Sequence, residues 1–498
     1  MSLRMLSLLA SAAMPGELET PSFDRERVQT LVRAYEELEK PYVPPLRGGT
    51  PLTLESVMSS VEAHHPKLRA AAAKVRQAQG KRLQAEGGFD PHLSVKGGTV
   101  PEGYYDVDEL NAEVRQHVYL WGTELFGGYR YGRGDHIATY DDRETLDEGE
   151  IRGGIRVPLL KGGYIDGTRA ALRTTELGLA VADADRQLSQ LELALSGAQA
   201  YWEWVAAGES LDVATELVRL AELRREQVEH EVARGAAPEI DRAEYLRSVL
   251  KRRTKLVEAV RKLEKASIKL SLYLRDDSGQ PMLPSPERLP TKVPMAEVGA
   301  SSFDAGMVRA LEERPELQTL ALAQEQAEVS GELADNGILP KLDFELAASK
   351  DLGTAPEEDT IKSLDPFYLK MSLKLEMPLF LRPGRGKAME SWAKLAETKA
   401  KLRYAMDQVR AEVQDVWSAL EASYRQARVA AHAADVAEAV AAGERARLFE
   451  GATSPYIVNL REQDAAETRL TEIDARASLQ VAATAWRLVT MSPELAPD

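Results

Sequence analysis

The sequence passes twice through the same order of motifs. Pro66 and Pro315 each open a helical segment and lie 249 residues apart, and the same offset separates Pro91 from Pro340. Repetition at this scale predicts two copies of one structural unit. The paired motifs are His65-Pro66-Lys67-Leu68 with Arg314-Pro315-Glu316-Leu317, Asp90-Pro91-His92-Leu93 with Leu339-Pro340-Lys341-Leu342, and Val157-Pro158-Leu159-Leu160 with Met377-Pro378-Leu379-Phe380.

The first copy is longer than the second at one place. Pro158 follows Pro91 by 67 residues, whereas Pro378 follows Pro340 by 38. The surplus includes residues 114–131, which are rich in Tyr, Trp and Phe. This segment is either an additional strand hairpin with interfacial aromatic residues or a folded outer loop, and the sequence leaves both readings open.

Composition excludes several classes of protein. A chain of 498 residues with 44% hydrophobic residues can bury a large core. A formal net charge of −16 argues against a nucleic-acid partner, because phosphates need a basic face. There are no cysteines and only seven histidines, and no catalytic or metal-ligand spacing is present. We therefore expect no enzyme activity, no cofactor and no metal.

Four segments have the alternation of strands. Residues 367–377 place apolar and polar side chains alternately over 11 residues, the length of a tilted transmembrane strand. We expect residues 342–348 to pair with them, and residues 151–157 to pair with 92–96. A half-buried soluble sheet would alternate in the same way. No apolar run is long enough for a membrane helix, so bilayer contact would fall to strands. The lipid-facing candidates are Phe367, Leu369, Met371, Leu373 and Leu375.

Two stretches without proline predict very long helices. Residues 166–233 and 384–450 could each extend roughly 100 Å as a helix. A helix of this length is stable only if other helices pack beside it along its whole length. We expect a return helix and a leading helix, stacked end to end, to run beside each long helix. The predicted return helices are 239–274 and 456–491, and the leading helices are 66–86 and 315–336.

A tight turn joins each long helix to its return helix. Glycine supplies a left-handed cap at the end of one helix, and proline fits the first turn of the next. A simple reversal of direction explains these residues fully, and a docking role is an additional hypothesis. The turn residues are Arg234, Gly235, Ala236, Ala237 and Pro238 in the first copy, and Gly451, Ala452, Thr453, Ser454 and Pro455 in the second.

The N-terminal region precedes both repeats. Residues 1–13 have a charge and a short apolar run typical of a secretory signal, the alternative being an incorrectly assigned start codon. Residues 23–40 predict an amphipathic helix that either packs outside the helical barrel or remains mobile. The predicted division is a signal peptide at 1–13, an extension with a Pro-rich linker at 14–50, a first repeat at 51–285 and a second at 286–498.

The ordered, duplicated motifs resemble the TolC-like outer-membrane efflux protein family over residues 50–491. The motifs on which this resemblance depends include Leu52-Thr53-Leu54-Glu55, the ends of the predicted strands at Pro158 and Pro378, and the turn Glu450-Gly451-Ala452-Thr453-Ser454. The resemblance implies a mainly α-helical protein with a membrane β part. A homotrimer would form a β-barrel in the outer membrane and a long α-helical barrel in the periplasm. Four strands cannot close a barrel alone, whereas three chains would supply twelve.

The resemblance also implies polar links that close the periplasmic entrance. The family typically has an Asp six residues after the turn Gly, and Asp241 matches this position. Ile457 stands at the corresponding place in the second copy, and Leu448 replaces the family's aromatic residue. The remaining polar candidates for a gate are Glu239 and Asn459, with simple solvent exposure as the alternative.

The leading functional hypothesis is a passive exit duct for a tripartite efflux or type I secretion system. Its implied partners are a periplasmic adaptor, also called a membrane fusion protein, an inner-membrane transporter and outer-membrane lipid. The alternative is a periplasmic or soluble coiled-coil scaffold without channel activity. The cargo is open.

Overall fold

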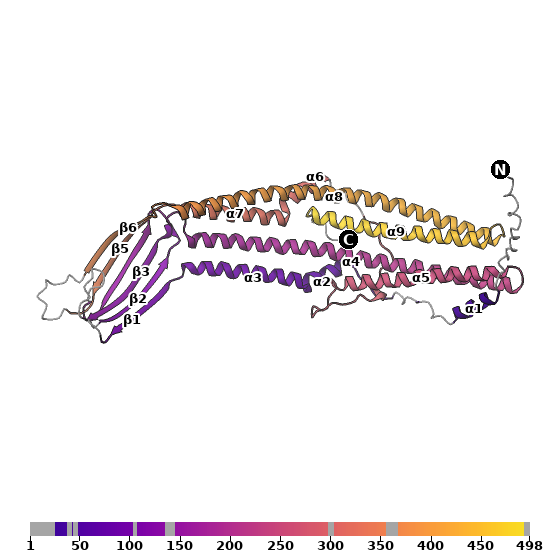
Figure 1. The fold of residues 1–498 in the computed structure, drawn as a ribbon, viewed down its shortest axis with the longest axis horizontal. Coiled ribbons are helices and arrows are strands. Elements are labelled where there is room, and N and C mark those ends of the chain that lie inside the picture. The colour runs from indigo at the N-terminus through magenta and orange to yellow at the C-terminus, as the bar shows by residue number, and fades with distance from the viewer. Residues whose placement is uncertain are drawn as a thin grey trace, which may run out of the picture.

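The structure is an elongated assembly of helices with a β-sheet at one end (Figure 1). It is a computed structural model and describes residues 25–36, 42, 48–102, 107–134, 145–296, 303–354 and 367–492. The expected signal peptide lies outside the described residues. Within those ranges, no helix combines the length and the apolar character that crossing a membrane requires.

The two long helices form as expected. α4 (Gly167–Ala233) begins after Asp166, whose side chain accepts hydrogen bonds from the amides of Thr168 and Arg169 at 2.8 and 2.9 Å. Such an N-cap satisfies amides that have no partner within the helix. α8 (Arg382–Phe449) carries Pro383 in its first turn, where the missing amide costs nothing.

Shorter helices stack end to end beside each long helix, which confirms the predicted arrangement (Figure 1). α3 and α5 pack along α4, while α7 and α9 pack along α8. α4 also packs against α7 and α9 and so joins the two halves. The bounds are α2 (Leu54–His64), α3 (Pro66–Glu86), α5 (Glu239–Leu270), α6 (Phe303–Glu313), α7 (Pro315–Asn336) and α9 (Pro455–Val489).

The sheet has six described strands, all antiparallel, in sequence order. The predicted pairing of residues 342–348 with 367–377 is confirmed as β5 with β6. The predicted pairing of 151–157 with 92–96 is wrong, because the surplus segment folds as a hairpin, β2 and β3, between them. The strands are β1 (His92–Val100), β2 (Val107–His117), β3 (Glu124–Gly134), β4 (Glu150–Pro158), β5 (Lys341–Asp351) and β6 (Phe367–Glu376).

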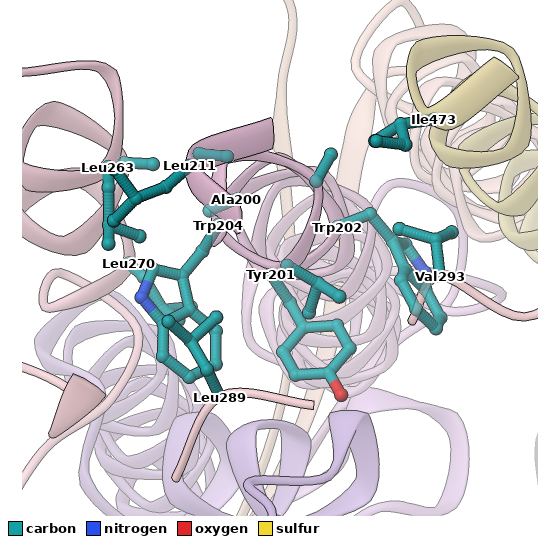
Figure 2. Close-up of a cluster of buried hydrophobic side chains, with 14 of the residues drawn as sticks. Ala200, Tyr201, Trp202, Trp204, Leu211, Leu263, Leu270, Leu289, Val293 and Ile473 are labelled. Atoms are coloured by element: carbon teal, nitrogen blue, oxygen red, sulfur yellow. The ribbon is translucent and has the colours of Figure 1, made fainter. Parts of the chain in front are cut away.

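The largest apolar cluster surrounds the middle of α4 (Figure 2). Trp204 is fully buried between α5 and the linker that carries Leu289. The Tyr201 hydroxyl donates to the Leu52 carbonyl at 2.8 Å, and burial raises the pKa of Tyr201 to about 12. Gly208 lies where a Cβ would collide with Leu289, so this glycine allows the linker to approach α4.

The N-terminal helix packs against the outside of the bundle. α1 (Arg25–Glu36) falls within the predicted segment 23–40 and contacts α5 (Figure 1). Tyr35 is buried, and the Arg253 guanidinium lies 4.5 Å from the centre of its ring. The Tyr35 hydroxyl donates to Glu222 on α4 at 3.3 Å. Of the two placements left open by the sequence, packing outside the bundle is therefore the one that the structure has.

A buried ion cluster holds α9 against α4 at the level of the apolar core. Arg476 is 3% exposed and lies 2.6 Å from the Glu209 carboxylate and 3.4 Å from that of Glu472. Glu209 also accepts the Val293 amide at 2.9 Å. A cation removed from water in this way needs its carboxylate partners, and they need it.

Replacing Arg476 with Met should lower the free energy of unfolding by about 3–5 kcal/mol, because it leaves the Glu209 carboxylate buried without its cation. Lys262→Met is the matched control: its pair with Asp474 likewise ties α9 to a neighbouring helix, here α5, but both side chains are more than half exposed. Breaking it should cost less than about 1 kcal/mol. Thermal unfolding followed by circular dichroism compares the two variants. Equal melting temperatures would show that the buried cluster contributes little.

Candidate functional site

The two helix turns at the end remote from the sheet have the same hydrogen-bond pattern. At the first, Gly235 has φ 73°, and the Ala236 amide donates to the Glu231 carbonyl at 2.8 Å. At the second, Gly451 has φ 71°, and the Ala452 amide donates to the Arg447 carbonyl at 2.8 Å. This is the Schellman arrangement, in which glycine takes the left-handed position.

Both turns are solvent-exposed and bring apolar side chains to the surface. Phe449 is 95% exposed, and Tyr456 and Ile240 are more than half exposed. Large exposed apolar side chains grouped at one place often mark a protein contact. Pro455 opens α9 as predicted, whereas Pro238 is the residue just before α5.

The structure does not bring the three gate candidates together. Glu239 pairs with Arg242 in the same helix at 2.6 Å. Asp241 has no ion-pair partner within the described residues, and its carboxylate adds to burial in raising the pKa of Tyr245 to about 12. Asn459 lies farther from the first turn and accepts a hydrogen bond from Arg252.

The contacts of Asn459 show that the two turns lie at different heights. Asn459 is four residues into α9, but its partners Ser248 and Arg252 are nine and 13 residues into α5. The first turn therefore extends beyond the second by five to nine residues of helix, about 7–13 Å. The same offset is visible where α4 and α5 reach past α8 and α9 (Figure 1).

A second buried ion cluster lies near the turns and joins the two helical hairpins. Glu462 on α9 is 3% exposed and faces Arg224 on α4 at 3.4 Å and Arg445 on α8 at 3.6 Å. Arg252 on α5 is also buried, and this burial lowers its pKa. Arg445 also pairs with Glu438 on α8 at 2.7 Å, so the cluster contains two carboxylates and three guanidinium groups. This cluster is absent from the sequence predictions. The signal that could have revealed it is the position of Glu462, four residues after Val458 and therefore on the buried stripe of α9.

The sheet has one apolar face and one charged face across all six strands. The pairing registers place the predicted lipid-facing residues of β6 on the apolar face, and all five are more than half exposed. The hairpin β2–β3 continues the same face in register. Members of this face include Leu93, Val114, Leu125, Ile155, Phe344 and Leu373.

The opposite face of the sheet is linked by ion pairs between strands. Arg156 on β4 pairs with Glu345 on β5 at 2.8 Å and with Glu124 on β3 at 3.2 Å. Arg152 on β4 reaches Glu113 on β2 at 2.5 Å. Opposite charges alternate on this face, so it forms a polar wall whose charges are locally balanced.

Exposed aromatic and apolar side chains gather where the sheet meets the helices. Tyr119 and Trp121 lie in the turn between β2 and β3, at the helix side of the sheet. Tyr164 lies just before α4, and Phe380 just before α8, and both are at least 70% exposed. Such a girdle is typical of membrane-water interfaces in barrel proteins. In the described part of the chain, no group of His, Cys, Asp and Glu could hold a metal ion.

Gly451→Ala should destabilise the second turn by about 1 kcal/mol, because a side chain there must adopt a left-handed backbone. Gly443→Ala, in the interior of α8, should instead stabilise the helix by up to about 1 kcal/mol. A Cβ would meet no neighbour at either position, so only backbone conformation differs. Melting temperature and amide exchange at residues 445–458 test the opposite signs. A similar effect of both substitutions would contradict the assignment of the cap.

Comparisons with known proteins agree with this architecture. Residues 307–490 match the sequence model of the family described as outer membrane efflux protein. No curated protein matches the sequence.

Several solved structures share the fold along most of both chains. A membrane protein from Pseudomonas aeruginosa is 14% identical, with a TM-score of 0.62 over 91% of this chain and 99% of that one. The outer membrane protein VceC from Vibrio cholerae is 16% identical, with a TM-score of 0.61 over 88% and 95%. The CmeC outer membrane channel of Campylobacter jejuni is 12% identical, with a TM-score of 0.60 over 91% and 93%. Residues 307–490 are therefore similar in sequence to the outer membrane efflux protein family, and the chain as a whole shares the fold of these three solved structures.

Proposed function

We propose that this protein is an outer-membrane exit duct that extends into the periplasm and conducts substrate passively. The observation that carries the proposal is the continuous apolar face of the sheet, bordered by exposed aromatic residues on the helix side. An apolar band flanked by aromatic residues is the lipid-facing surface of a membrane barrel. The charged face then lines an aqueous interior.

The helical half fits the periplasmic part of such a duct. α4 and α8 run from the sheet to the turns without interruption, a length of about 100 Å each. The proposed assembly is a homotrimer, and its partners are a periplasmic adaptor and an inner-membrane transporter. The exposed turns with Phe449, Tyr456 and Ile240 are the proposed contact surface for the adaptor.

The proposed gate lies at the turns. The cluster around Glu462 ties α9 to α4 and α8 through ion pairs with Arg224 and Arg445. Opening the turns by moving α9 would break these ion pairs. An adaptor that binds the open arrangement better would then shift the equilibrium towards it. Asp241, which has no cation on its own chain among the described residues, is proposed to pair across the entrance with a neighbouring copy.

Asp241→Ala should increase the leak of small ions through the closed channel in planar-bilayer recordings, because it removes one side of the proposed link. Glu244→Ala is the control, since Glu244 is one turn away on α5 and pairs with Arg247 on the surface. Unchanged conductance in Asp241→Ala would remove this residue from the gate and leave the channel assignment intact.

Leu373→Arg should prevent assembly in the outer membrane, because an arginine on the lipid face of a barrel costs about 2–4 kcal/mol near the middle of the bilayer. Ser372→Arg, the next residue along β6, lies on the polar face and should be tolerated. Membrane fractionation and trimer content on unheated gels measure the difference. If wild type and both variants were all soluble and monodisperse without detergent, the result would contradict the channel and support the scaffold alternative.

A further inference from the structure

β1 and β6 are the two outermost of the described strands. Within the described residues, β1 pairs with β2 alone and β6 with β5 alone. Both strands expose apolar side chains, with Leu93 at 63% and Leu373 at 67%. In a bilayer, every backbone amide and carbonyl must be hydrogen-bonded, so these edges need a strand.

We propose that β1 of one copy pairs with β6 of a second copy of this chain, so that all six strands, the hairpin β2–β3 included, form the wall. This inference rests on the proposed function. In a trimer the closed barrel then has eighteen strands. This number replaces the twelve strands that four strands per chain would give.

The two edges are complementary. Because six antiparallel strands alternate in direction, β1 and β6 run opposite ways and can extend the antiparallel order. Their lengths are nine and ten residues. Pairing them joins the apolar face of one copy to that of the next. At the helix side, His92 and Glu376 both lie on the polar face, where a donor can meet a carboxylate.

Side-chain contacts fix the additional hairpin in the wall. The guanidinium of Arg152 on β4 passes β3 and donates to Asn111 and Glu113 on β2. It crosses β3 at Gly128, whose register partner on β4 is Arg152 itself. A Cβ at Gly128 would collide with the Ala112 carbonyl. These contacts hold β2 and β3 within the plane of the sheet as inner strands. An outer loop would not need such contacts.

The width of a six-stranded wall matches the helices below it. α3, α4, α7 and α8 pack as a row of four beneath the sheet. Four helices at about 8–10 Å spacing occupy roughly 32–40 Å. Six strands about 4.8 Å apart and tilted by about 40° occupy roughly 38 Å, whereas four strands would occupy roughly 25 Å. A barrel of eighteen strands leaves an aqueous channel, so its cargo class includes bulky hydrated solutes.

Disulfide cross-linking tests the pairing, because the chain has no cysteine of its own. Leu93→Cys is combined in turn with Met371→Cys, Leu373→Cys and Leu375→Cys in the full-length protein in outer membranes. Oxidation should give covalent trimers at one register. Ala112→Cys on β2, which shares the apolar face, is the control and should give none with the same partners. Cross-linking through Ala112→Cys in place of Leu93→Cys would place β1 outside the wall and overturn the inference.

Labelling tests whether β2 spans the membrane. Leu110→Cys and Val114→Cys should resist a water-soluble maleimide, while Asn111→Cys, on the polar face, should react. Equal and rapid reaction of all three would make the hairpin an aqueous loop and overturn the inference.

Wild-type behaviour separates this inference from the proposed function. A conducting trimer whose β1 does not cross-link to β6 contradicts the eighteen-stranded wall alone. A wild-type protein that forms neither trimers nor conductance contradicts both.

Discussion

The packing of α4 against α3, α5, α7 and α9 is the constraint on which the rest of the structure depends. A helix of 67 residues is stable only if its apolar stripe is covered along its whole length. The first half of the chain covers it with α3 and α5, and the second half contributes α7 and α9. The sheet at one end and the turns at the other are therefore held in register by one continuous helix that contacts both halves.

Charge is buried at two levels along the contact between α4 and α9, with different consequences. At the core, Arg476 is paired with Glu209 and Glu472, so the buried charge is well compensated. Near the turns, Glu462 faces Arg224 and Arg445, and Arg445 also pairs with Glu438. The level in the middle therefore joins α9 to α4, whereas the level near the turns, where a conformational change is proposed, joins α9 to both α4 and α8.

Local signals in the sequence were sufficient for the helices, because proline and glycine end or begin a helix regardless of its partners. α3 and α7 have the predicted bounds. The hairpin β2–β3 could not be assigned, since glycines at 127, 128 and 132 interrupt the apolar alternation of β3. Its insertion also made the expected pairing of β1 with β4 wrong. The separation of Asn459 from Asp241 depends on the offset between hairpins, which no local pattern encodes.

That offset makes the end of each chain a step. A rigid partner that approaches along the helices meets the first turn before the second, and it must be longer on one side, or inclined, to contact both. Two hairpins with identical caps therefore present unequal binding positions. Each chain in a ring contributes two nearly equivalent turns. Because the two turns lie at different heights, the rotational symmetry of the ring is still set by the number of chains and not by the number of turns.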